Sequence, residues 1–151
     1  KSSMGWFFGF KLHIIVNDKG ELLSFKVTKG NVNDRVPVKD LCNSITGKLY
    51  GDKGYIGKQL FHDLFEDGVQ LVTNVRSNMK NKLISLRDKL MLRKRFIIET
   101  INDQLKNISN IEHLRHRSPT NFMVNLVCGL ISYTWKDKLP SINVDNVPNV
   151  L

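Results

Sequence analysis

The sequence of 151 residues predicts an α/β fold, because strand-like and helix-like patterns alternate along the chain. Residues 5–16 are rich in aromatic and β-branched side chains, a turn with Gly20 follows, and residues 21–28 return as a second strand. This pattern indicates a β-hairpin. Residues 47–75 have the pattern of a strand, a helix and a strand, with a length that suits a right-handed parallel crossover.

A short helix is expected before this crossover. Residues 36–45 have helical spacing, with Asp34 as the N-cap. The crossover itself comprises a short buried strand at 47–52, an amphipathic helix at 58–66 and a strand at 69–75. The helix carries its apolar side chains on one face: Leu60, Phe61, Leu64 and Phe65.

The C-terminal half is expected to be mainly helical. Residues 76–90 are basic and poorly patterned, so an exposed loop with a short helix is expected there. Helical spacing predicts a helix over residues 92–107, and a serine–proline start predicts another over residues 118–135. We therefore expect one domain over residues 1–138, followed by an extended or disordered tail over residues 139–151.

The net charge of +9 and the pI near 9.7 favour a polyanionic partner, most simply nucleic acid. A membrane surface or mere solubility is also consistent with this surplus. The charge is uneven, because residues 76–95 hold eight Lys and Arg side chains against a single acid, Asp88. Residues 115–117 add another basic cluster, so basic charge lies on both sides of the helix expected over residues 92–107.

Several classes of protein are disfavoured. Cys42 and Cys128 stand far apart without histidines at ligand spacing, which argues against a zinc site or a disulfide framework and fits a reducing cytoplasm. No apolar run approaches the roughly 20 residues of a membrane span, and no signal peptide is visible. We expect a cytoplasmic protein with no membrane partner.

Arg95, Glu99 and Lys106 lie on one stripe of the helix expected over residues 92–107. At about 100° per residue, Glu99 and Lys106 lie within about 40° of Arg95. The other face packs through apolar side chains: Ile97, Ile98, Ile101, Leu105 and Ile108. A carboxylate beside a buried stripe, with a lysine about 10 Å further along the axis, suits a metal ion with a phosphate nearby. The alternative is a solvated glutamate that pairs with Arg95 or Lys106.

Asp52 is the best candidate for a second carboxylate. It stands between a short strand and a turn with Gly54 and Gly57, at the kind of strand end where ligands collect in α/β sheets. Mg²⁺ prefers oxygen ligands, and a DNA strand supplies more of them. The alternative is an ordinary turn aspartate. Such metal sites normally need a third carboxylate.

Other polar residues each allow a structural and a functional interpretation. Arg115, His116 and Arg117 form a basic loop before a helix, or else contact phosphates near a cleavage site. His13 alternates with apolar neighbours and is interpreted as an ordinary strand residue rather than a ligand. Asp34 is interpreted as a helix cap rather than a metal ligand.

Five motifs follow one another in order: GFKLH (9–13), TKGNVNDR (28–35), GDKGY (51–55), the run Arg95-x3-Glu99-x6-Lys106, and RHRS (115–118). Together they resemble the catalytic domain of bacterial insertion-sequence transposases of the DDE type, over about residues 5–135. The resemblance implies a ribonuclease H-like mixed sheet flanked by helices. It also implies metal-dependent cleavage and transfer of DNA strands by two aspartates and a glutamate.

The resemblance assigns roles to individual residues. Asp52 matches the second aspartate of the triad and Glu99 its glutamate, while Arg95 and Lys106 match the cations that lie near the transposon-end DNA. Leu92 stands where many relatives have a tyrosine. The first aspartate belongs on a strand before GFKLH, so we expect a chain that is truncated at its N-terminus, lacks an upstream DNA-recognition domain and is inactive alone.

The expected function is therefore that of a transposase catalytic fragment. Asp52 and Glu99 would hold Mg²⁺ or Mn²⁺, and Arg95, Lys106 and the basic residues 115–117 would contact DNA. The expected partners are transposon ends, target DNA and a second copy of the intact enzyme, in a bacterial cytoplasm near the nucleoid. The alternatives are a non-catalytic DNA-binding remnant and a related metal-dependent nuclease.

Overall fold

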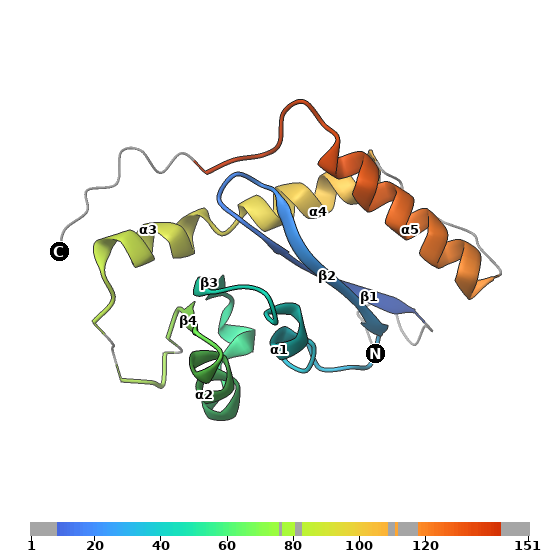
Figure 1. Cartoon of the computed structure of the whole chain (residues 1–151). Coiled ribbons are helices and arrows are strands. Elements are labelled where there is room, and N and C mark those ends of the chain that lie inside the picture. The colour runs from blue at the N-terminus through green and yellow to red at the C-terminus, as the bar shows by residue number, and fades with distance from the viewer. Residues whose placement is uncertain (1–8, 76, 81–82, 109–110, 112–117, 143–151) are drawn as a thin grey trace. The chain divides into compact units, whose positions relative to one another are not determined.

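The computed structural model describes residues 9–75, 77–80, 83–108, 111 and 118–142 (Figure 1). These residues fall into two compact units. The first unit contains the described residues within Lys1–Ile15 and Leu23–Arg93, and the second contains those within Val16–Leu22 and Lys94–Pro148. Each unit is described by itself below.

A parallel strand–helix–strand crossover lies at the centre of the first unit. Strands β3 (Gly47–Gly51) and β4 (Val69–Thr73) pair in parallel, with Gly47 opposite Val69 and Gly51 opposite Thr73. Helix α2 (Lys58–Glu66) connects them, and Gly68 provides the positive φ of 80° that ends the connection. The crossover predicted from the sequence is confirmed, including both ends of its helix.

The core of the first unit joins this crossover to the hairpin and to helix α1 (Val38–Leu41). Its buried members are Ile15, Val38, Leu41, Cys42, Leu64, Val69 and Leu71. The expected apolar face of α2 is only half correct, because Leu64 is fully buried whereas Phe61 and Phe65 are 42% and 64% exposed. The two exposed rings stack on each other with centroids 6.3 Å apart.

The short helix α1 corrects two expectations. It covers four residues rather than the predicted 36–45, and its N-cap is Pro37 rather than Asp34. Asp34 lies four residues before the helix begins, too far to cap it, and its carboxylate accepts a hydrogen bond from Lys11 Nζ at 2.8 Å. Asp34 therefore takes part in a tertiary ion pair.

The predicted hairpin is confirmed. Strands β1 (Phe10–Val16) and β2 (Leu22–Lys29) pair in a two-stranded sheet. In the turn, Asn17 Oδ1 accepts hydrogen bonds from the amides of Lys19 and Glu21, and Gly20 has a φ of 78°.

The mixed α/β class is confirmed, but the described strands form two separate two-stranded sheets, β1–β2 and β3–β4. The single flanked sheet expected of a ribonuclease H-like domain is not formed among these strands.

The prediction of one continuous helix over residues 92–107 is wrong. The structure has two helices in this region, α3 (Leu86–Lys94) and α4 (Ile97–Asn107), with Arg95 and Phe96 between them. Leu92 and Ile97 are both buried, yet a continuous helix would place them about 140° apart. The break lets each helix bury its own apolar side in its own unit.

The second unit is built from α4 and α5 (Pro119–Thr134), which pack on each other. Its buried side chains include Ile101, Leu105, Leu126, Leu130 and Tyr133. The Tyr133 hydroxyl donates a hydrogen bond to the Gly20 carbonyl at 2.7 Å, which ties α5 to the hairpin turn. The predicted serine–proline helix start is confirmed, with proline at the first position.

The last described residue contacts the hairpin turn. The Ile142 amide donates to the Asp18 carbonyl at 2.6 Å, whereas residues 143–151 of the expected tail lie outside the described residues.

Within the described part of the chain, no helix is both long and apolar enough to cross a membrane.

Candidate active site and its supporting contacts

Asp52 lies where the sequence predicts, directly after β3. Its backbone is extended, and its Oδ1 accepts a hydrogen bond from the Lys53 amide at 2.7 Å, which caps the short 3₁₀ helix η1 (Lys53–Tyr55). The side chain is exposed. A carboxylate held by its own turn and facing solvent is suited to binding a cation or a polar ligand.

The turn after Asp52 is braced by Arg35, which sequence reasoning did not select. Arg35 Nη1 donates to the Ile56 carbonyl at 3.2 Å, and Asn33 Oδ1 accepts from the amide of Arg35 at 3.1 Å. A Cβ at Gly57 would lie 3.3 Å from Arg35 Nη1, so the guanidinium packs closely against this turn. The position of Arg35 in TKGNVNDR was its only sequence signal.

The first two motifs also contact one another. Lys11 Nζ donates to the Val32 carbonyl at 2.8 Å as well as to Asp34, and His13 Nε2 lies 2.8 Å from Thr28 Oγ1. Burial lowers the pKa of His13; the charge of Asp34 opposes this effect, and the nearby lysines add to it. His13 is therefore a half-buried strand residue, as predicted, and Asp34 is an ion-pair partner of Lys11.

A second cluster, which the sequence did not reveal, surrounds Asp88 of α3. Lys48 Nζ lies 2.9 and 3.0 Å from the two carboxylate oxygens, and the Tyr50 hydroxyl donates to Oδ1 at 2.8 Å. Burial of Asp88 opposes its ionisation, but hydrogen bonds from Lys48, Tyr50 and Ser85 outweigh this and hold its pKa below the ordinary value. Burial and the contact with Asp88 raise the pKa of Tyr50.

Glu99 and Lys106 are both exposed on α4, and Ile101 and Leu105 are buried on its other side. The predicted separation of a charged and an apolar face is confirmed for these residues, whereas Ile108, also predicted on the apolar face, is 67% exposed. Glu99 is in the first turn and Lys106 in the last, where each charge also complements the helix dipole.

The remaining cations of the predicted site are placed differently or not at all. Arg95 is half-buried in the break before α4, so it does not share the helix stripe with Glu99, which corrects that expectation. Arg115 and Arg117 lie outside the described residues, as does His116. Asp52 belongs to the first unit and Glu99 to the second, so the pairing of their carboxylates stays a prediction.

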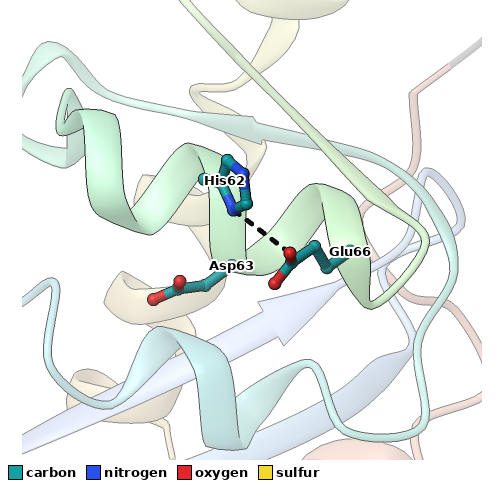
Figure 2. A group of neighbouring side chains, drawn as sticks. All are labelled: His62, Asp63 and Glu66. Atoms are coloured by element: carbon teal, nitrogen blue, oxygen red, sulfur yellow. Dashed lines mark ion pairs between the residues drawn. The ribbon is translucent and has the colours of Figure 1, made fainter.

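Figure 2 shows a different group on α2, formed by His62, Asp63 and Glu66. Their ligand atoms lie within 4.8 Å of one another, and His62 Nδ1 is 3.4 Å from Glu66 Oε1. The side chains of His62 and Glu66 are 70% and 63% exposed, and Asp63 accepts a hydrogen bond from Gln59 at 2.7 Å. These contacts are those of an ordinary charged helix surface.

Comparison with known proteins decides the family. A family model described as a transposase DDE domain matches residues 1–119. The chain belongs to the DDE transposase family. The match contains Asp52 and Glu99 and ends at Pro119, the first residue of α5. No curated protein and no solved structure matches the chain significantly.

Membership of this family sets the general chemistry. Transposases act on DNA, and DDE transposase domains generally depend on divalent metal ions. The basic composition of the chain agrees with a polyanionic substrate.

Proposed function

We propose that the chain takes part in metal-dependent cleavage and transfer of DNA strands during transposition of a bacterial insertion sequence. The observation that carries this proposal is the family match across residues 1–119, which includes a carboxylate at the end of β3 and another on α4. A ribonuclease H-like arrangement of the catalytic domain is part of the same proposal.

Asp52 and Glu99 are the proposed ligands of Mg²⁺ or Mn²⁺. Both side chains are exposed carboxylates, which is the type of donor that these hard cations prefer. A divalent cation held by Asp52 and Glu99 would supply activation of the attacking water or 3′ hydroxyl and stabilisation of the leaving oxygen. The contacts of Lys53 and Arg35 support this role because they hold the turn that presents Asp52.

Arg95, Lys106, Arg115 and Arg117 are the proposed contacts to DNA phosphates. Such contacts position the substrate without reading its sequence. A homodimer that joins two transposon ends and an association with the nucleoid also belong to the proposal.

The proposal predicts that Mn²⁺ strengthens DNA binding through Asp52. Fluorescence anisotropy with a 30-base-pair duplex should show tighter binding in Mn²⁺ than in EDTA for the wild type. Asp52→Asn should lose this gain, because an amide is a poorer cation ligand, while it keeps the affinity measured in EDTA. Asp137→Asn, at an exposed aspartate of the second unit, is the matched control.

If Asp52→Asn keeps the metal-dependent gain, the assignment of the metal ligand is wrong. A DNA-binding protein without metal chemistry would then explain the chain better.

A further inference from the structure

We propose that α3 is a DNA-binding helix, which contacts the phosphate backbone of duplex DNA through Lys89 and Arg93. This inference rests on the proposed function in one respect, namely that DNA is the substrate. It adds a binding surface in the first unit.

The exposed face of α3 has the required geometry. Asp88 and Leu92 are 8% and 4% exposed and define the inner side of the helix. Lys89 and Arg93 are exposed and stand four residues apart, so they lie about 6 Å apart along the axis and within about 40° around it. Two cations one turn apart on an outward face are suited to neighbouring phosphates.

The charge of this face is not cancelled by the acid within the helix. Asp88 is the single acid of α3, and its carboxylate is directed inward to Lys48 and Tyr50 of β3. The cations of α3 are Arg87, Lys89, Arg93 and Lys94. The contact with Lys48 and Tyr50 therefore directs the negative charge of Asp88 away from the outer side of α3, which stays positive.

The same ion pair places α3 beside the strand that leads to Asp52. Lys48 and Tyr50 both reach Asp88, and alternate residues of a strand lie on one face. Asp52 follows Tyr50 by two residues with an extended backbone, about 7 Å further along the strand direction. The contact between α3 and β3 thus holds the proposed DNA-binding helix in the same unit as the candidate metal ligand.

The expected ligand is duplex DNA bound through its backbone, independently of sequence. The test measures the affinity for a mixed-sequence 30-base-pair duplex in EDTA as a function of salt concentration. For Lys89→Gln/Arg93→Gln, the slope of log K against log salt should decrease in magnitude by about 2, because each lost phosphate contact removes about 0.9. The matched control is Lys19→Gln/Lys138→Gln, which removes the same charge at exposed positions of the second unit.

A second readout is protection of lysines from acetylation, followed by mass spectrometry. Lys89 should be protected several-fold by DNA, and Lys19 and Lys138 should not. The inference is overturned if both double variants change the slope equally, if Lys89 is not protected, or if the wild type does not bind the duplex. These measurements are made without metal. The DNA-binding role of α3 can therefore be refuted while Asp52 remains a metal ligand, and Asp52 can be refuted as a metal ligand while α3 still binds DNA.

Discussion

Replacing Ile101 by alanine is expected to lower the free energy of unfolding by about 2–5 kcal/mol. The side chain is fully buried on the inner side of α4, so its removal costs transfer free energy and leaves a cavity. Chemical denaturation in urea, monitored by circular dichroism, measures this change. Glu99 lies two residues earlier on the exposed side of the same helix, so the packing of Ile101 also supports the candidate ligand.

Two variants make this result specific. Ile101→Val should cost only about 0.5–1.5 kcal/mol, because it removes one methylene group. Thr100→Ala, at the exposed neighbouring position, should change the stability by no more than about 0.5 kcal/mol. Equal effects of Ile101→Ala and Thr100→Ala would contradict the described face of α4.

The second large effect is expected for Asp88→Ala, which should lower the free energy of unfolding by about 1–3 kcal/mol. The change leaves the Lys48 ammonium and the Tyr50 hydroxyl without their carboxylate partner. The Lys48 side chain is 43% exposed and can return to water, so the loss should stay below the roughly 3–5 kcal/mol of a fully buried pair. Tyr50→Phe removes one hydrogen bond and should cost about 1 kcal/mol.

The cluster around Asp88 also makes the stability of the protein depend on pH. The pKa of Asp88 is lowered in the folded state, so its stabilisation is present above the unfolded pKa of about 4 and is lost as the pH falls further. The pKa of Tyr50 is raised, so its stabilisation is present below about pH 10 and declines above it. Urea unfolding between pH 3 and 11 should show the difference between wild type and Asp88→Ala shrinking at both ends. A difference that is constant across this range would contradict the cluster.

Elements defined by local patterns could be predicted from the sequence. The bounds of α2 follow from its helical spacing and the Asp67–Gly68 stop, and the hairpin follows from its turn residues. The location of Asp52 was predictable for the same reason, since a strand and a glycine-rich turn surround it. These features depend on interactions between residues that are close in the chain.

Features that depend on distant contacts could not be predicted. Asp88 meets Lys48 and Tyr50 across 40 and 38 residues, so no local spacing reveals the cluster. The break before α4 depends on the burial of Leu92 and Ile97 in different units, and periodicity alone therefore placed Arg95 on the wrong element. The presence of one acid among eight cations was the only local sign that Asp88 has a special environment.

The central claim is that Asp52 and Glu99 bind the same divalent cation, and a titration of the chain with Mn²⁺ followed by electron paramagnetic resonance tests it most directly. Asp52→Asn and Glu99→Gln should each weaken Mn²⁺ binding by at least about tenfold. The double variant should be little worse than either single variant, because both ligands serve one site. Asp137→Asn should bind Mn²⁺ like the wild type. Unchanged Mn²⁺ affinity in either single variant, or an equal loss in Asp137→Asn, would contradict the claim.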